Sequence, residues 1–417
     1  MATTAAQPSL SQINAQARAA VLARSLDRMQ IIYSQTIATP GTANNVIQIA
    51  PQNVGLVKGF LVEISGTVTN TGAATPANDA TLTDFGVANV LSQVIFNDLQ
   101  NYTRIQTAGW HLALMDSVKR RRPFGAALAL AANGGILPAE AAFPLGYGDN
   151  WNVITAPTVL AGAAGGPGVS SGPFRMMYWV PLSYADNDLR GAVYMNVVNA
   201  TAQLQLTLNP APSVAGVAAT GTDTTLAMYV GAAAPVTFSN VTVTVFQSYL
   251  DQLPMGKNGP ILPPLDLSTI YELKNTQLIG MVQATDFPIP YPNFRDFMST
   301  FVIFDNVGGT PVGAGPTRSF GTDLNYWTLQ SANLTNLWKV PPEVVALKSR
   351  NHIGMDFPAG TYYFDSRNRP ISTVQYGNLN LIMNPSVVCN PGAVALIGFE
   401  DLGLVNTLTG AGSLPGS

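Results

Sequence analysis

Hydrophobic and polar residues alternate in the segment that ends near the middle of the chain. Residues 241–246 read Val-Thr-Val-Thr-Val-Phe, and this period of two predicts a β-strand that runs on to Leu253. A strand cannot pass through the prolines and glycines that follow, because proline lacks an amide donor and glycine adds backbone freedom. Asp266–Thr269 then offers cap residues for a short helical turn over Ile270–Leu273. We therefore expect a stiff connector between two halves of similar size, with the candidate residues Tyr249, Leu250, Asp251, Pro254, Pro263 and Pro264.

Short segments recur in the same order in these two halves. Val94–Asp98 is echoed by Val302–Asn306, and Leu204–Pro210 is echoed by Leu379–Pro385. Each copy of the first segment precedes a tryptophan-containing stretch with helical spacing, marked by Trp110, Leu112 and Met115 in one half and by Trp327, Leu334 and Trp338 in the other. Because three echoes keep one order, the sequence favours a tandem duplication.

The longest predicted helix covers Ser9–Gln30, near the N-terminus. One stripe at helical spacing carries Ala15, Ala19, Leu22, Leu26 and Met29, while the arginines lie on the other side or at its edge. The helix is either an arm packed on a neighbouring subunit or an arm near an anionic membrane surface. A basic residue near such a surface contributes only about 1 kcal/mol, so many copies would have to act together. The candidate residues of this membrane-proximal or assembly-switch arm are Arg18, Leu22, Arg24, Leu26, Arg28 and Met29.

Short strands separated by turns fill most of the remaining chain, which is typical of an all-β protein with long loops. One more helix is predicted over Gly109–Val118, and Phe124–Leu145 and Ala156–Pro173 are predicted loops of low complexity. We divide the chain into an arm (1–34), a first β-half (35–253), a second β-half with the connector (254–401) and a polar tail (402–417). The predicted strands are Val46–Ile49, Gly59–Ile64, Leu91–Phe96, Met176–Val180, Val193–Val198, Leu204–Leu208, Val236–Phe246, Leu278–Val282, Phe301–Phe304, Tyr362–Phe364, Ile371–Tyr376, Leu379–Met383 and Val394–Phe399.

Charged residues make up only 10% of the chain, against about a quarter in an average protein. A free monomer usually keeps a charged surface for solubility, and buried interface cores are depleted in charge. We therefore expect other protein to cover much of this surface. The net charge of −3 provides no basic field to attract nucleic acid. No secretory leader is visible, and no stretch reaches the roughly 18 apolar residues of a membrane span, so we expect a soluble chain that is made inside the cell.

No group of residues in the sequence makes a convincing catalytic or metal site. Gly168–Gly172 has the spelling of a nucleophile elbow, but it lies in a Gly/Pro-rich loop instead of between a strand and a helix. Asp84–Gly86 matches a kinase triplet without the other kinase motifs, and Asp186–Asp188 is better explained as a turn than as a calcium loop, because Arg190 occupies a ligand position. The basic run Lys119–Arg122 is interpreted as a solvated helix end. One cysteine and two distant histidines cannot hold zinc. We expect no enzymatic activity, no cofactor, no metal and no specific nucleic-acid binding.

Longer strings of the chain make a more specific pattern, and through them the sequence resembles the major capsid protein of the tectiviruses, which are icosahedral bacteriophages with an internal membrane. The resemblance runs from about Val54 to Asn390 and includes Val54–Val62, Leu82–Gly86, Gly109–Leu112, Tyr178–Leu182, Gln247–Pro254, Asp266–Thr269, Gly321–Asp323, Asp356–Pro358 and Gln375–Asn378. It does not extend clearly to the two low-complexity loops or to the tail after Asp401.

The resemblance implies an all-β fold of two tandem eight-stranded jelly-roll β-barrels in one chain, with an N-terminal helical arm and short helices in loops. It implies homotrimers of six barrels that tile an icosahedral shell, with the arm on the inner side as a position-dependent switch. The expected partners are further copies of the chain, vertex and minor capsid proteins, and, peripherally, the viral inner membrane. The expected location is the virion shell, after assembly in the host cytoplasm.

Two other functions are compatible with a jelly-roll chain. A carbohydrate-binding or glycan-cleaving protein would be a monomer or small oligomer with aromatic side chains along a groove, and calorimetry with sugars would detect it. A vertex or spike protein of the same virion would be present in few copies, and counting copies in purified particles would separate it from a shell protein.

Overall fold

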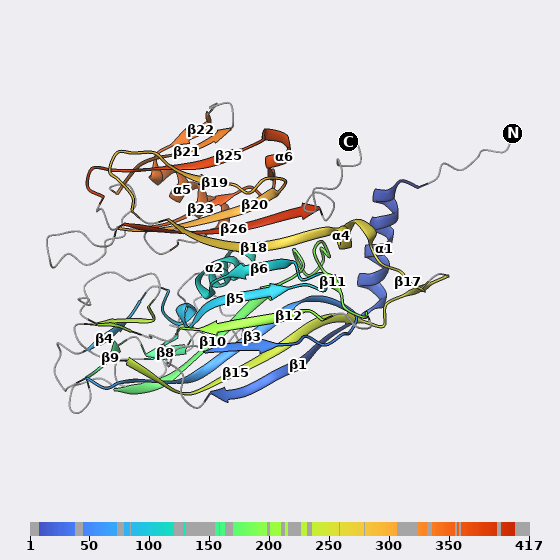
Figure 1. Ribbon diagram of the computed structural model, residues 1–417, viewed down its shortest axis with the longest axis horizontal. Coiled ribbons are helices and arrows are strands. Elements are labelled where there is room, and N and C mark those ends of the chain that lie inside the picture. The colour runs from blue at the N-terminus through green and yellow to red at the C-terminus, as the bar shows by residue number, and fades with distance from the viewer. Residues whose placement is uncertain are drawn as a thin grey trace.

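The computed structural model describes residues 8–404, except for 38–44, 73–78, 84, 121–127, 131–154, 158, 163–169, 198–200, 210–212, 216–226, 232–235, 258, 279, 307–322, 332–335, 355–356, 358–359 and 390–392. The described residues form two β-barrels that lie side by side, with the helix α1 at one end of the first barrel (Figure 1). The chain is therefore an all-β protein, as the sequence predicts.

The first barrel has eight principal strands in two sheets of described residues. One sheet has the order β1-β15-β3-β10, and the other has the order β2-β12-β5-β6. Along the strands, buried residues that fill the core alternate with more exposed ones, as in a sheet with one face inward. The strands are β1 (Leu26–Ile37), β2 (Val46–Ile49), β3 (Leu56–Asn70), β5 (Leu91–Asn97), β6 (Thr103–Thr107), β10 (Ser171–Pro181), β12 (Gln203–Leu208) and β15 (Val236–Asp251).

The second barrel repeats this arrangement strand for strand. Its sheets have the orders β18-β26-β20-β23 and β19-β25-β21-β22. When the principal strands of each barrel are counted in chain order, both barrels have the order 1-8-3-6 in one sheet and 2-7-4-5 in the other. The strands are β18 (Thr269–Leu278), β19 (Phe287–Pro290), β20 (Asp296–Asp305), β21 (Leu324–Ser331), β22 (Asn336–Val340), β23 (Thr361–Asp365), β25 (Leu379–Pro385) and β26 (Val394–Leu404).

Helices and short strands occupy the connections. The helices are α1 (Leu10–Arg24), α2 (Gly109–Arg120), α4 (Pro264–Ser268), α5 (Pro342–Ile353), α6 (Thr373–Tyr376) and the 3-10 helix η2 (Gly86–Val90). The short strands are β4 (Ala80–Leu82), β7 (Leu128–Leu130), β8 (Thr155–Pro157), β9 (Val159–Leu160), β11 (Val193–Tyr194), β13 (Ser213–Ala215), β14 (Tyr229–Gly231), β16 (Met255–Gly256), β17 (Gly259–Pro260) and β24 (Ile371–Ser372). Both α2 and α5 connect the fifth and sixth strands of their barrels, so they are equivalent elements.

A continuous sheet joins the two barrels. Strand β6 of the first barrel pairs in parallel with β18 of the second, at Ile105–Leu273 and Gln106–Lys274. The apolar cluster of the first barrel extends into the second and includes the buried residues Phe301 and Leu396, whereas a separate cluster fills the interior of the second barrel. The two barrels therefore pack against each other through a shared sheet and a shared apolar cluster.

The two barrels share one strand order, but only part of the predicted correspondence between the halves is correct. Leu204 lies in β12 and Leu379 in β25, and both are seventh strands. Val94 lies in the fourth strand of its barrel, whereas Val302 lies in the third strand of the other, so these segments are not equivalent. Trp327 and its neighbours form strands β21 and β22, so the predicted helical stretch there is wrong. Buried strands use few residue types, which explains the false match.

The N-terminal helix is shorter than the sequence predicts. Ser9 begins it with a capping box, and it ends at Arg24. From Leu26 the chain forms β1, which pairs with β15 starting at Asp251. The predicted helix over Ser9–Gln30 is therefore wrong beyond Arg24, because tertiary pairing overrides the helical spacing. The predicted apolar stripe is also wrong: Ala15 and Ala19 are exposed, and the buried residues of the helix are Asn14, Ala17 and Val21.

Other predicted boundaries also change. The strand and helix predictions over Val46–Ile49 and Gly109–Val118 are confirmed by β2 and α2. Ile270–Leu273 is part of strand β18 instead of a helical turn, because the turn occurs earlier, in α4. The predicted strand over Ile371–Tyr376 becomes β24 followed by α6, and β18 ends at Leu278, where the next predicted strand was to begin. Strand β26 continues to Leu404, into the predicted tail.

Candidate assembly site

The arm helix α1 docks on the connector helix α4 through polar groups. The side-chain oxygen of Asn14 accepts hydrogen bonds from the backbone amides of Leu265 (2.8 Å) and Asp266 (3.2 Å). The amide nitrogen of Asn14 donates to a carboxylate oxygen of Asp266 (2.9 Å). Asn14 therefore satisfies two amides at the start of α4, where a helix leaves backbone donors without partners.

Arg18 completes this contact with a charged pair. Its Nε donates to Oδ2 of Asp266 (2.6 Å) and its Nη2 donates to Oδ1 of the same carboxylate. The hydrogen bonds to Asp266 raise the pKa of Arg18 above its ordinary value, against the opposing effect of burial. The Asp266 side chain is only 1% exposed. A charge this deeply buried needs a partner, so the connector carboxylate depends on the arm.

An apolar cluster lies beside this polar contact. Val21 of α1 is fully buried there together with Leu56 and Leu250, and Leu22 packs against the cluster. Leu253 and Leu267 pack against it from the connector. The arm is thus attached to the first barrel and to the connector at once.

The remaining candidate residues of the arm lie on β1 or at the end of α1. Arg28 forms an ion pair with Asp251 of β15 (3.0 Å), and both side chains are partly exposed. Arg24 is exposed and makes no ion pair within the described residues. The side chains of Leu26 and Met29 are also exposed, by 46% and 54%. The structure therefore brings Arg18, Leu22 and Arg28 to the connector. The side chains of Arg24, Leu26 and Met29 are exposed.

The connector residues have three different roles. Tyr249 donates from its hydroxyl to the side chain of Gln30 (3.3 Å), and the carbonyl of Pro254 accepts from the amide of Ile261 (2.7 Å) in the hairpin of β16 and β17. Pro263 and Pro264 begin α4, where a fixed φ and a missing amide are favourable. Asn14 was not predicted as a site residue, and Asp266 was predicted only as a cap. A polar residue among alanines on α1 was the available signal.

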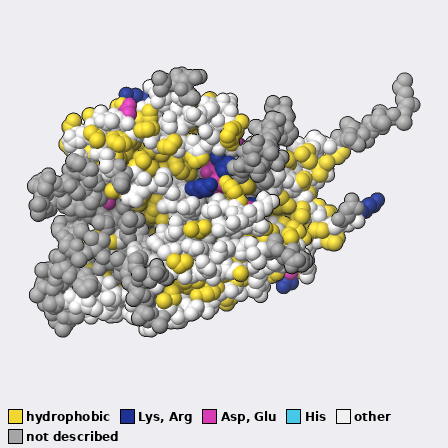
Figure 2. Space-filling view, in the orientation of Figure 1, with side chains coloured by type: hydrophobic (Ala, Val, Ile, Leu, Met, Phe, Trp, Pro, Cys, Tyr) yellow, Lys and Arg dark blue, Asp and Glu magenta, His cyan; other side chains and the backbone are white. Residues whose placement is uncertain are grey.

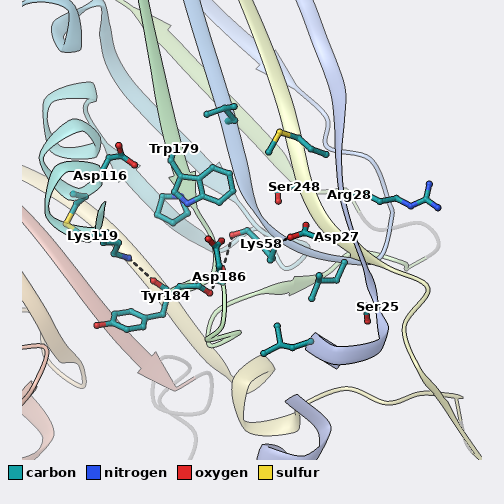
Figure 3. A pocket seen from close by; sticks show the side chains of 18 of the residues that line it. Ser25, Asp27, Arg28, Lys58, Asp116, Lys119, Trp179, Tyr184, Asp186 and Ser248 are labelled. Atoms are coloured by element: carbon teal, nitrogen blue, oxygen red, sulfur yellow. Dashed lines mark hydrogen bonds and ion pairs between the residues drawn. The ribbon is translucent and has the colours of Figure 1, made fainter. Parts of the chain in front are cut away.

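A hollow of about 750 Å³ lies beside the arm, on the outer side of the first barrel (Figure 3). Lys58 forms an ion pair with Asp27 in it (2.6 Å), and Trp179, Leu61 and Met29 supply apolar surface. The walls come from α1, α2, the strands β1, β3, β10 and β15 and the loop Ser183–Asp186, and Arg367 of the second barrel adds to them. The hollow therefore combines charged and apolar groups at the place where the arm meets the sheet.

Charged residues are also buried between the two barrels. In Figure 2, blue and magenta side chains mark charged residues at the surface of this junction. Glu400 is fully buried and accepts hydrogen bonds from Ser299 (2.7 Å) and Tyr271 (2.9 Å), while Lys119 of α2 lies 2.9 Å away. Burial would raise the pKa of Glu400, but the charge of Lys119 and these hydrogen bonds outweigh it and keep the pKa below its ordinary value. Lys119, at the start of the predicted basic run, is thus a partner of a buried acid.

A second group of charges lies next to Glu400. Glu272 contacts Arg295 (3.0 Å) and Lys274 (3.2 Å), and Arg295 also lies 3.2 Å from Asp401. Asp401 pairs with Glu272 across β18 and β26. Burial, and then the charge of Glu272, raise the pKa of Asp401 well above its ordinary value. Tyr102 of the first barrel accepts from Arg295 (2.8 Å), so this network links the barrels.

The described residues contain no group of three or more His, Cys, Asp and Glu side chains that could hold a metal ion. No described helix is both long and apolar enough to cross a bilayer.

His111 is fully buried, and burial lowers its pKa to about 3, so it is neutral at ordinary pH. Asp84, Gly168 and Val169 of the sequence motifs lie outside the described residues, and Ser171 and Gly172 belong to strand β10.

Comparison with known proteins decides the family. Residues 3–253 match the N-terminal domain of the P3 major capsid protein, and residues 268–414 match its C-terminal domain. The chain belongs to the P3 major capsid protein family. It is 38% identical over 402 residues to the major capsid protein P3 of Enterobacteria phage PRD1, which covers 96% of this chain and 93% of that protein. It is thus a major capsid protein of a PRD1-like phage and a structural component of the virion.

Solved structures of low sequence identity share the fold. The crystal structure of the STIV MCP has a TM-score of 0.56 at 13% identity and covers 93% of this chain and 100% of its own. A quasi-atomic structure of the PBCV-1 virus capsid has a TM-score of 0.54 at 12% identity. The match covers 94% of this chain and 97% of that chain. These neighbours are double jelly-roll proteins, which agrees with the two equivalent strand orders described above.

Proposed function

We propose that this capsid protein forms homotrimers with a pseudo-hexagonal outline, which tile an icosahedral shell around an internal membrane. The observation that carries the proposal is the identical 1-8-3-6 and 2-7-4-5 strand order of the two adjacent barrels. Three such chains supply six similar barrels, which is the number that a hexagonal tile needs. The low charge of the chain fits subunits that cover one another.

Sedimentation velocity of the purified chain tests this proposal. At micromolar concentration we expect a single species with three times the 43.9 kDa chain mass. An obligate interface of about 2,000–5,000 Å² would keep it together on dilution. A species of one chain mass at every concentration would contradict the proposal. Quantifying the protein in purified particles separates a shell role, with many copies, from a vertex or spike role, with few.

We also propose that the arm is an assembly switch near the inner membrane, with the α1–α4 contact as its docked state. Two hydrogen-bonding side chains, Asn14 and Arg18, hold the polar part of this contact. Leu10 and Ile13 are 53% and 43% exposed and, with Arg24, are free to meet lipid or a neighbouring copy. Flotation of the trimer with anionic vesicles tests the membrane contact: wild type floats, and an Arg24→Glu variant floats less. Equal flotation of both would contradict it.

The proposed partners beyond the trimer are neighbouring trimers, vertex proteins and minor capsid proteins, assembled in the host cytoplasm. The proposed domain division keeps a first jelly roll up to residue 253 and a second up to residue 401, with the connector between them. Strand β1 belongs to the sheet of the first jelly roll, so the arm proper is the helix α1.

A further inference from the structure

Two carboxyl groups lie against each other inside the junction between the barrels. Glu272 of β18 and Asp401 of β26 are directly opposite in the strand register, and each side chain is 1% exposed. The carboxyl of Asp401 is hydrogen-bonded to that of Glu272. An ionised carboxylate can only accept hydrogen bonds, and two like charges at such positions repel each other. The contact between the two acids therefore needs one shared proton.

Arg295 joins this pair of acids to the first barrel. Its Nε donates to Oε2 of Glu272 (3.0 Å), and its Nη2 donates to the hydroxyl of Tyr102 (2.8 Å). The Tyr102 hydroxyl in turn donates to Oε1 of Glu272. Tyr102 directly precedes β6, the strand that pairs with β18. The three side chains thus close a ring of hydrogen bonds that spans the two barrels.

The backbone around Arg295 holds its side chain in this place. The amide of Arg295 donates to Oγ1 of Thr373, and its carbonyl accepts from the Thr373 amide, both at 2.9 Å. Phe294, just before Arg295, has a φ of 62°, in the left-handed region where a bulky residue is strained. Such strain persists only where the surrounding contacts fix it, and it is concentrated at functional positions. The arginine is therefore positioned for the junction.

Asp401 offers a second acceptor to the same arginine. Its Oδ1 is buried and accepts no hydrogen bond within the part of the chain that the structure describes. This oxygen lies only 3.2 Å from Nε of Arg295, whose N–H group donates to Glu272. An ionised Asp401 would compete for that N–H group, since hydrogen bonds between charged groups are the stronger ones. Arg295 therefore has alternative partners, and the protonation of Asp401 decides between them.

Other charged groups near the two acids are exposed or form ion pairs of their own. Lys274 of β18 lies 3.2 Å from Glu272, but its side chain is 32% exposed, so water weakens its effect. Tyr271 and His111 also lie near the acids and are neutral, because burial raises the pKa of the tyrosine and lowers that of the histidine. The neighbouring ion pairs are Lys119–Glu400, Arg104–Asp98 and Arg367–Asp365. The cation that responds to the shared proton is therefore Arg295.

We propose that Glu272, Asp401, Arg295 and Tyr102 form a proton-dependent latch between the two barrels. While Asp401 carries the shared proton, Arg295 binds Glu272 and Tyr102, and the latch is closed. When the O–H bond of Asp401 breaks and the proton passes to water, the new carboxylate draws Arg295 away from Tyr102. The two acids then repel each other, and the first barrel loosens from the second at β6. The latch lies within one chain and goes beyond the proposed function.

Amide hydrogen exchange of the purified protein, resolved by mass spectrometry, tests the latch. As the pH rises above about 3.9, the ordinary pKa of an aspartate, opening of the latch releases the proton and becomes more favourable by up to about tenfold per pH unit. We expect exchange in β6 to show this additional rise after correction for the intrinsic chemistry of exchange at each pH. Strand β15, in the other sheet of the first barrel, serves as the internal reference. Equal corrected pH dependences in β6 and β15 of the wild type would overturn the proposal, however well any variant folds.

Asp401→Asn separates the shared proton from the rest of the contact. The asparagine amide donates to Glu272 at every pH, as a protonated aspartic acid does, so we expect the corrected exchange in β6 to stay at its low-pH value. Glu63→Gln is the matched control, because Glu63 belongs to a partly exposed pair with Arg175, and its profile should follow the wild type. Tyr102→Phe removes the contact of the first barrel and should give fast exchange in β6 at every pH. A rise with pH in Asp401→Asn as large as in the wild type, or slow exchange in Tyr102→Phe, would contradict the latch.

Discussion

At the scale of single residues, several of the chain's few charges lie in buried pairs. Asp266 holds the arm, and Glu272 and Glu400 lie between the barrels with Arg295 and Lys119. Ion pairs of this kind contribute to stability only when both partners are present, since a lone buried charge is costly. Removing one partner is therefore the informative experiment.

Asp266→Asn is expected to loosen the arm without unfolding the barrels. Losing the charged hydrogen bonds to Arg18 lowers the local stability of α1 by about 1.5–3 kcal/mol, which corresponds to roughly 10- to 100-fold faster amide exchange in the helix. Asp251→Asn is the control, because the Arg28–Asp251 pair is partly exposed and contributes less than about 1 kcal/mol. Equal exchange rates in α1 for the two variants would contradict the role of Asp266.

Asp401 and His111 change the free energy of unfolding with pH in opposite directions. The folded-state pKa of Asp401 is raised, so its contribution to stability is present below the unfolded pKa of about 3.9 and is lost as the pH rises toward the folded value. His111, with a folded pKa of about 3, takes up its proton mainly on unfolding between about pH 6.5 and 3, so its contribution is lost on acidification.

Asp401→Asn should therefore flatten the decline of stability with rising pH. Relative to wild type, we expect the free energy of unfolding to fall less as the pH rises above about 3.9, by up to about 1.4 kcal/mol per pH unit. Denaturant titrations at several pH values measure this difference. Glu63→Gln, in the partly exposed pair with Arg175, is the control. Parallel pH profiles for wild type and Asp401→Asn would show that the carboxyl is ionised in the folded protein.

At the scale of elements, close packing of α2 on β26 fixes how the barrels meet. A Cβ added at Gly398 would lie 2.5–2.8 Å from ring atoms of His111. Gly398→Ala is therefore expected to push α2 away and to lower stability by about 1–3 kcal/mol. At Gly256 the nearest atom is 3.4 Å away, so Gly256→Ala should have little effect. Thermal unfolding midpoints compare the two, and similar midpoints would contradict the tight contact.

The elements also show what the sequence alone can predict. Alternation in Val46–Ile49 and Val236–Phe246 predicted β2 and most of β15 because each has one buried face. The start of strand β1, Leu26–Gln30, was predicted as helix because its burial pattern is nearly uniform and its pairing partner, β15, lies over 200 residues away. The Arg18–Asp266 contact was not predicted for the same reason: spacing along a helix does not show what a distant segment places against it.

At the scale of the whole molecule, two similar barrels and their internal contact define a repeating step. Strand β6 of the first barrel pairs with β18 of the second, and α2 of the first barrel packs on β26 of the second. A chain with only 10% charged residues is poorly suited to be an isolated monomer. Low charge is suited to a subunit whose surface is covered by its neighbours.

The most direct measurement is a cryo-EM reconstruction of the purified oligomer. We expect three copies around a threefold axis and six barrels in a ring. A reconstruction with one or two copies would contradict the account.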